Sequence, residues 1–232
     1  MHENNLIRYS LITTKMKREM ILLIGTGCKW KKCKFCDYYN DVSSDPFLIN
    51  KSVINKLTGK FGVLDVVNSG SCFELDKNTL NFLKEKVSEL TIHTIWFEAH
   101  WLYHNELNEF RSMFPGIVIK FRSGIETFNA SLRNSWSKGI PCTVSVNEIA
   151  KYFDGVCLLV GIKGQTKDII LEDIKLALKH FEYFNINVFN KNSTSVERDE
   201  NLISWFKTNI APQLKENNHV EILINNKDLG VG

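Results

Sequence analysis

The sequence predicts an α/β fold with a mostly parallel sheet, of the partial (β/α)6 TIM-like barrel type. Short apolar runs alternate along the chain with segments of helical periodicity, which is typical of parallel strands joined by right-handed crossover helices. The 232 residues are 44% hydrophobic and 24% charged, an ordinary globular composition that suits one barrel domain. A doubly wound sheet would produce the same alternation and remains the alternative.

Seven apolar runs are the expected strands. The first, residues 20–25, is apolar throughout and predicts a strand buried on both faces. The others are residues 63–67, 94–97, 117–121, 156–160, 186–189 and 220–224. In either architecture, functional side chains gather at the carboxyl ends of parallel strands. The segments that follow these runs are therefore the places to search for a site.

Three segments between the runs have the period of an amphipathic helix. Asp76 is a candidate N-cap for the first of them. Their apolar positions are Leu80, Leu83, Val87 and Leu90; Ile170, Ile174, Ala177, Leu178 and Phe181; and Leu202, Trp205, Phe206 and Ile210, with Pro212 near the end. We expect one domain over 1–232, with a cysteine loop at 25–37. A helix, strand and tail at 196–232 are expected to close the barrel mouth.

Charge and hydropathy narrow the class of protein. The formal net charge is only +3, too small to imply a nucleic acid or membrane partner by itself. No apolar run reaches the ~18 residues that span a bilayer, and the first five residues are not those of a signal peptide. We therefore expect a cytoplasmic protein with reduced thiols, no membrane contact and no nucleic acid partner.

Cys28, Cys33 and Cys36 lie in one loop after the first strand, with the spacing C-x4-C-x2-C. A structural zinc site normally takes a fourth Cys or His, and an iron–sulfur cluster usually takes four thiolates. Three thiolates therefore suggest a [4Fe–4S] cluster with one open iron. An incomplete zinc knuckle, or three unrelated buried cysteines, are the alternatives. Cys72, Cys142 and Cys157 are expected to be inert core residues.

This loop resembles that of the radical S-adenosylmethionine (SAM) enzymes. Their usual spacing is C-x3-C-x2-C, so this chain has one additional residue in the first gap. Phe35, before the last cysteine, matches an aromatic residue that lies against the adenine in that superfamily. The resemblance implies a [4Fe–4S] cluster held by the three cysteines and a bound SAM. One-electron cleavage of that SAM would produce a 5′-deoxyadenosyl radical.

The resemblance continues in segments that follow later strands. Residues 68–71 correspond to the segment that holds the methionine amino group, and residues 122–126 to the one near the carboxylate and ribose. Residues 161–166 resemble a G-x-x-G-Q-T segment that recurs late in the fold, and Asn190 ends the sixth strand. The cofactor-binding residues implied are Phe35, Ser69, Gly70, Arg122, Ser123, Glu126 and Asn190.

Several strings resemble those of radical SAM enzymes that act on 7-deazaguanines, namely residues 27–37, 68–71, 96–101, 123–127 and 224–230. Two activities fit this resemblance. One cleaves the C–N bond of free queuine and releases 7-aminomethyl-7-deazaguanine, and the other acts on a modified base within transfer RNA. The short chain and nearly balanced charge favour the free base. A one-electron donor such as flavodoxin or ferredoxin is also implied.

The substrate would need particular side chains. A guanine-like edge offers an N–H and an NH2, which one carboxylate can accept together. Asp37, Glu98 and Asp228 are the candidates, with a structural ion pair for Glu98 and a helix cap for Asp37 as alternatives. Tyr38 is a candidate for stacking on the base, and Lys163 for meeting a carboxylate. The alternatives are a core position for Tyr38 and a solvated one for Lys163.

Overall fold

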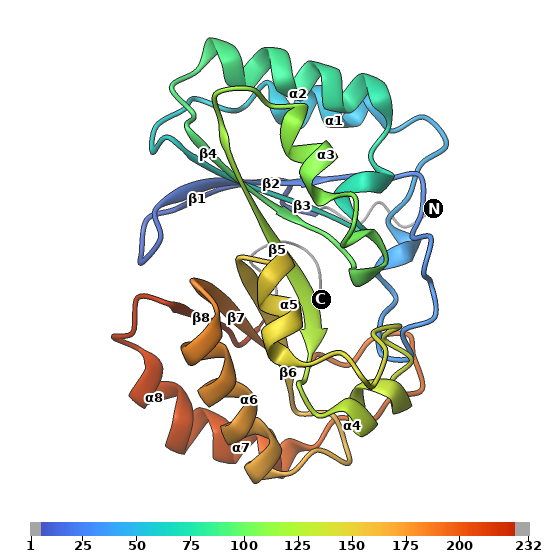
Figure 1. Ribbon diagram of the computed structural model, residues 1–232, viewed down its shortest axis with the longest axis vertical. Helices are drawn as coiled ribbons and strands as arrows, with labels where there is room; N and C mark the ends of the chain where they lie inside the picture. The colour runs from blue at the N-terminus through green and yellow to red at the C-terminus, as the bar shows by residue number, and fades with distance from the viewer. Residues whose placement is uncertain (1–5, 226–232) are drawn as a thin grey trace. The chain divides into compact units, whose positions relative to one another are not determined.

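The computed structural model describes residues 6–225 and confirms the predicted fold class (Figure 1). The sheet order is β1 to β8 in sequence. Strand β1 is antiparallel to β2, whereas the pairs β2–β3, β3–β4, β5–β6, β6–β7 and β7–β8 are parallel. The strands are β1 Tyr9–Ile12, β2 Arg18–Leu23, β3 Val63–Asn68, β4 Thr94–Glu98, β5 Val118–Glu126, β6 Gly155–Val160, β7 Tyr183–Val188 and β8 Val220–Leu223.

Helices follow most of the parallel strands, as the alternation predicts. They are α1 Phe47–Ile54, α2 Lys77–Glu89, α3 Leu107–Ser112, α4 Ala130–Ser135, α5 Val146–Tyr152, α6 Lys167–His180, α7 Glu200–Trp205 and α8 Ala211–Leu214. Asp76 caps α2 by accepting a hydrogen bond from the Thr79 backbone N–H. The helix expected over 202–210 is instead α7, a π-helical segment Phe206–Ile210 and α8, which contains Pro212. No helix within residues 6–225 is long and apolar enough to cross a membrane.

The described chain forms two compact units. The first comprises residues 6–31 and 38–121, and the second comprises residues 32–37 and 122–225. In the first unit, α1 and α2 lie on one face of the β2–β3–β4 sheet (Figure 1). Buried Asn50 of α1 exchanges two hydrogen bonds of 2.8 Å with the backbone of Ile24 and donates to Thr79 of α2. This contact fixes the end of β2, from which the cysteine loop begins.

In the second unit, every residue of β6 is buried, as is nearly every residue of β7. Helix α6 packs on both strands through the face that carries Ile170, Ile174 and Ala177. None of the six cysteines, all of which lie within the described residues, forms a disulfide. Cys72 and Cys157 are buried as predicted, but Cys142 is exposed, which corrects the expectation of a core position. Cys142 lies on a turn between α4 and α5 and therefore has no sheet or helix to cover it.

Candidate active site

The first part of the cysteine loop belongs to the first unit and is held through its backbone. Cys28 is partly buried, and the Lys31 backbone N–H lies 3.4 Å from its sulfur. The Glu74 carboxylate accepts a 2.9 Å hydrogen bond from the Lys29 backbone N–H, directly after the cysteine. An N–H···S bond stabilises a thiolate, and the anchored amide limits where Cys28 can move.

Glu74 also binds the segment after β3. It accepts hydrogen bonds from the Ser71 N–H at 2.8 Å and from the Tyr103 hydroxyl at 3.1 Å. Burial, with the charge of Glu74 next, raises the pKa of Tyr103, so the phenol stays protonated and donates. A Cβ on Gly70 would lie 2.1 Å from the Glu74 carboxylate. The Glu74 carboxylate therefore occupies the space that a side chain at residue 70 would fill, so only glycine fits at this position without displacing it.

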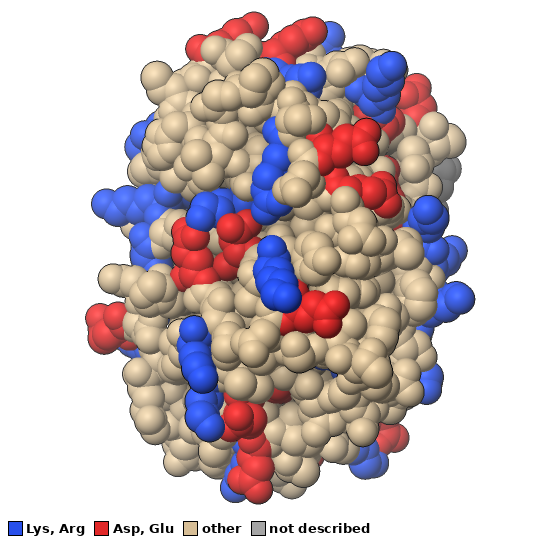
Figure 2. Space-filling view, in the orientation of Figure 1, with Lys and Arg blue, Asp and Glu red and all other residues tan. Residues whose placement is uncertain are grey.

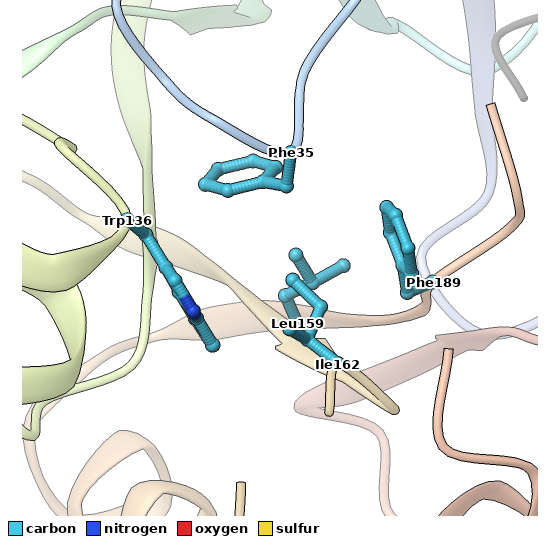
Figure 3. Close-up of a cluster of buried hydrophobic side chains, with 5 residues drawn as sticks. All are labelled: Phe35, Trp136, Leu159, Ile162 and Phe189. Atoms are coloured by element: carbon cyan, nitrogen blue, oxygen red, sulfur yellow. The ribbon is translucent and has the colours of Figure 1, made fainter. Parts of the chain in front are cut away.

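The second part of the loop belongs to the second unit and packs on an apolar cluster. Cys33 and Cys36, both partly buried, lie against buried side chains of Phe35, Trp136, Leu159, Ile162 and Phe189 (Figure 3). The Phe35 and Trp136 rings meet edge to face, with centroids 5.9 Å apart. Their neighbours Leu159 and Ile162 come from the end of β6 and the turn after it. The two thiols therefore have an apolar support.

A buried ion pair lies beside this cluster. The Lys138 ammonium binds the Glu126 carboxylate at 2.9 Å and lies 5.6 Å from the centre of the Phe35 ring. Burial alone would lower the pKa of Lys138, but the negative charges of Glu126, Cys33 and Cys36 raise it above its usual value. The ammonium is therefore permanently charged and favours the thiolate form of both cysteines.

The donor set fits a thiolate-ligated cluster. Three cysteines stand within nine residues of one loop, with an N–H near the first sulfur and a buried ammonium that favours thiolates at the other two. Within residues 6–225, no three or more His, Cys, Asp or Glu side chains are arranged as a metal site. The fit to a thiolate-ligated cluster therefore rests on the chemistry of the three cysteines and not on sulfur atoms already arranged around a metal.

Of the predicted SAM-binding residues, Ser69 follows β3 and Asn190 follows β7, and Phe35 lies in the cysteine loop. Arg122 and Ser123 lie within β5 rather than after it, because this strand runs to Glu126 and does not end at residue 121 as predicted. Ser69 is buried and donates to the Asp41 carbonyl at 2.6 Å. Arg122 and Ser123 are buried on β5, and the Ser123 hydroxyl has no hydrogen-bond partner within the described residues. Asn190 follows β7 and donates to the Asn225 carbonyl at 2.9 Å. Their roles toward SAM remain predictions.

The predicted substrate-binding residues are more dispersed. Asp37 accepts two hydrogen bonds from Ser193 at 2.9 and 2.8 Å rather than capping a helix. Glu98 ends β4 and is partly buried. Tyr38 is partly buried at the start of a 3-10 turn, and exposed Lys163 forms an ion pair with Glu197. Asp228 lies outside the described residues.

Two residues that the sequence reasoning missed hold the loop. Glu74 stands three residues after Ser71, which is the spacing of a capping box and was a usable signal. Lys138 had no local signal, because its partner Glu126 is twelve residues away along the chain.

Comparison with solved structures shows a close similarity to a queuine lyase and a weaker one to two other enzymes. Queuine lyase from Clostridium spiroforme, solved with SAM and queuine, has a TM-score of 0.93 and 42% identity, covering 98% of this chain and 99% of that chain. Streptococcus suis SuiB has a TM-score of 0.55 at 15% identity, covering 94% of this chain and 50% of that chain. Methylornithine synthase (PylB) has a TM-score of 0.57 at 18% identity, covering 88% and 63%. No family model and no curated protein matches the sequence.

The partial barrel, the three-cysteine loop and these relatives place the chain among the radical SAM enzymes. SuiB and PylB share the fold alone at their low identity. At 42% identity over nearly the whole of both chains, the chain belongs to the queuine lyase family.

Proposed function

We propose that this protein is a radical SAM lyase that acts on free queuine. It breaks the C–N bond between the aminomethyl nitrogen and the cyclopentenediol, and releases 7-aminomethyl-7-deazaguanine. The observation that carries this proposal is the 42% identical relative of the same length, which was solved with SAM and queuine.

Cys28, Cys33 and Cys36 would hold a [4Fe–4S] cluster, with one iron open to SAM. When bound, this group supplies the electron that cleaves SAM to methionine and a 5′-deoxyadenosyl radical, which takes a hydrogen atom from the cyclopentene ring. The chain itself positions the ligands. The hydrogen bond between Glu74 and the Lys29 amide holds the loop at Cys28. The apolar cluster excludes water near the other two cysteines.

SAM would lie along the carboxyl ends of the strands. Phe35 would cover the adenine, Ser69 and Gly70 would face the methionine amino group, and Arg122 would meet its carboxylate. Ser123, Glu126 and Asn190 would complete the contacts near the ribose. The Ser123 hydroxyl supports this assignment, because it is buried without a hydrogen-bond partner within the described residues and buried polar groups need one.

Contacts to the base are proposed for the carboxylates and the ring near the loop. Asp37, Glu98 or Asp228 would accept N–H groups of the base, and Tyr38 would stack on it. Lys163, whose ammonium pairs with Glu197, is the remaining candidate for a contact with the substrate. Asp37 is held in place by Ser193, which would leave its second oxygen as the acceptor.

Surface charge supports a small substrate and a separate electron donor. On the face drawn in Figure 2, acidic and basic side chains are interspersed, and this face has no broad basic area of the kind that transfer RNA would need. Lys29, Lys31, Lys32 and Lys34 are exposed beside the cysteines. They would suit an acidic one-electron donor such as flavodoxin or ferredoxin. Such thiol chemistry needs a reducing compartment such as the cytoplasm.

The test compares cysteine variants of the anaerobically reconstituted protein. Iron and sulfide are measured first, and then 5′-deoxyadenosine and 7-aminomethyl-7-deazaguanine after incubation with SAM, reductant and queuine. Cys28→Ser, Cys33→Ser and Cys36→Ser should each abolish both products. The control Cys142→Ser should behave as the wild type, because this exposed thiol lies outside the loop. A wild-type protein that binds only zinc, or makes neither product, would refute the proposal.

A further inference from the structure

Strand β7 presents a row of amide side chains on one face of its sheet. Alternate residues of a strand point in opposite directions, so Asn185 and Asn187 share a face while Phe184, Ile186 and Val188 share the other. Asn185 is paired with Cys157 of β6 and Glu221 of β8, and Asn187 with Leu159 of β6. This polar row is unusual for a parallel sheet, where strands are normally apolar on both faces.

The amide oxygens of both residues are buried without a partner. Neither Asn185 Oδ1 nor Asn187 Oδ1 has a hydrogen bond within residues 6–225, although Asn185 is only 4% exposed. The Asn185 amide nitrogen donates to the Glu221 carboxylate at 3.0 Å. A carboxylate only accepts, so this bond fixes which way the amide points. Asn185 therefore has a defined, unused hydrogen-bond acceptor.

The row leads to the cysteine loop. Phe189 continues the alternation two residues after Asn187, about 7 Å further along the strand, and its N–H still pairs with Val160 of β6. Phe189 and Leu159 both belong to the apolar cluster on which Cys33 and Cys36 pack (Figure 3). The amide acceptors thus border an apolar, partly aromatic surface within the same unit.

A structural role does not explain these oxygens. An unpaired buried acceptor lowers stability, and Leu would fill the same volume without that cost. A buried polar atom without a protein partner calls for one from outside the chain, such as a water, an ion or a ligand, and ligand sites place a few polar groups among apolar side chains. An acceptor beside aromatic and aliphatic side chains suits a flat heterocycle with N–H donors at its edge.

We infer that Asn185 and Asn187 accept hydrogen bonds from the N–H groups of the 7-deazaguanine base, with Glu221 orienting Asn185. This inference rests on the proposed function and adds two amide acceptors to the carboxylates proposed for that same site. Phe189 and Leu159, which border the row, lie against the face of the base, and the two amides select for donors at its edge.

The test measures binding to the cluster-loaded protein under anaerobic conditions, with SAM but without reductant, so that no turnover occurs. Titration calorimetry gives the dissociation constants of queuine and of 7-aminomethyl-7-deazaguanine, which lacks the cyclopentenediol, and a separate titration gives that of SAM. Asn187→Leu should weaken both ligands roughly 10- to 100-fold, since the bond lost is one to a buried acceptor. Asn187→Asp keeps the acceptor and should stay within about fivefold of the wild type. Glu221→Gln, which no longer fixes the Asn185 amide, should weaken both ligands a few-fold.

Two controls separate ligand recognition from folding. The exposed Asn78→Leu on α2 should change no constant. The ligand-free Asn187→Leu protein should unfold at the wild-type temperature or above it, because an unpaired polar atom has been removed. A lower unfolding temperature would indicate a structural role and overturn the inference.

The remaining outcomes are also decisive. Weakening of queuine alone would assign the amides to the diol, and weakening of SAM alone would assign them to the cofactor. Either result, or unchanged binding in Asn187→Leu, overturns the inference while leaving the lyase proposal intact. A wild-type protein that neither binds nor cleaves queuine would instead refute the proposed function.

Discussion

At the scale of single residues, two side chains hold the cysteine loop, one near its first cysteine and the other near its last two. Glu74 binds the backbone next to Cys28, and Lys138 supplies positive charge near Cys33 and Cys36. Each side chain also makes a second contact. Glu74 accepts a hydrogen bond from the Ser71 N–H, and Lys138 pairs with the Glu126 carboxylate. Removing either side chain should therefore affect more than one contact.

Glu74→Ala should loosen the first part of the loop. The substitution leaves the Lys29 and Ser71 amides and the Tyr103 hydroxyl without their acceptor. We expect a loss of about 1–3 kcal/mol in the free energy of unfolding. Hydrogen exchange should also become faster in peptides that contain residues 27–31. Urea unfolding and exchange mass spectrometry check this, with exposed Glu85→Ala as the control. Unchanged exchange in that peptide would show that Glu74 does not hold the loop.

Lys138→Met should strongly destabilise the second unit. The Glu126 carboxylate would remain buried without its cation, and breaking a buried pair from one side costs about 3–5 kcal/mol. The double variant Lys138→Met/Glu126→Gln should recover part of that loss. Lys175→Met removes an exposed pair with Glu172 and should change stability by about 0.5 kcal/mol or less. Equal effects of the buried and exposed substitutions would refute this account.

At the scale of elements, the turn Gly161–Thr166 ends β6 and starts α6. The Gln165 side chain accepts from the Gly161 and Ile162 amides and donates to the Leu159 carbonyl. Thr166 caps α6 by accepting from the Ile169 N–H. The G-x-x-G-Q-T segment therefore has a structural role, because its polar side chains form hydrogen bonds with backbone groups between the end of the strand and the start of the helix.

The two glycines of this turn provide a matched test. Gly161 and Gly164 have φ values of +98° and +97°, so alanine is equally strained at both. A Cβ at Gly161 would lie 2.3 Å from Ile203 of α7, whereas nothing lies within 4 Å at Gly164. Gly161→Ala should therefore cost at least about 1 kcal/mol more than Gly164→Ala in thermal or urea unfolding. Equal costs would mean that α7 does not pack on this turn.

Asp173 of α6 should make the stability of the protein depend on pH. It accepts a 2.7 Å hydrogen bond from the Phe128 N–H, and burial raises its pKa from 3.8 to about 6. The folded state therefore binds the proton of Asp173 more tightly than the unfolded state does. This tighter binding stabilises the fold fully below about pH 4, and the stabilisation is lost as pH rises through 6. Relative to Asp173→Asn, the wild type should lose about 1.4 kcal/mol between pH 5 and 7.5. Parallel stability curves for the two proteins would contradict this.

At the scale of the whole molecule, the strands that sequence reasoning found are those with continuous apolar runs. It missed β1, which has four residues and no fully buried one. It also missed α1, where Leu48 and Ile49 are exposed and blur the helical period. Helices α3, α4 and α5 have only six or seven residues, too few for a clear period.

The candidate site also contains some residues that the sequence could predict and others that it could not. The three cysteines are close together in sequence, so their spacing alone suggested a cluster loop. The roles of residues 68–71 and 122–126 came from the resemblance to radical SAM enzymes and stay predictions. The roles assigned to Lys138 and Asn187 depend on neighbours that are distant in sequence, Glu126 for Lys138 and Leu159 for Asn187. Spacing alone does not contain that information, because it depends on how strands pair and turns close.

The most direct measurement of the central claim is a side-by-side assay of free queuine and of transfer RNA that contains queuosine. Each is incubated anaerobically with the reconstituted protein, SAM and a one-electron reductant, and the products are quantified by mass spectrometry. Free queuine should yield 7-aminomethyl-7-deazaguanine and 5′-deoxyadenosine, and the transfer RNA should remain unchanged. Cleavage of the RNA-bound base in preference to the free one, or the absence of the aminomethyl base, would contradict the account.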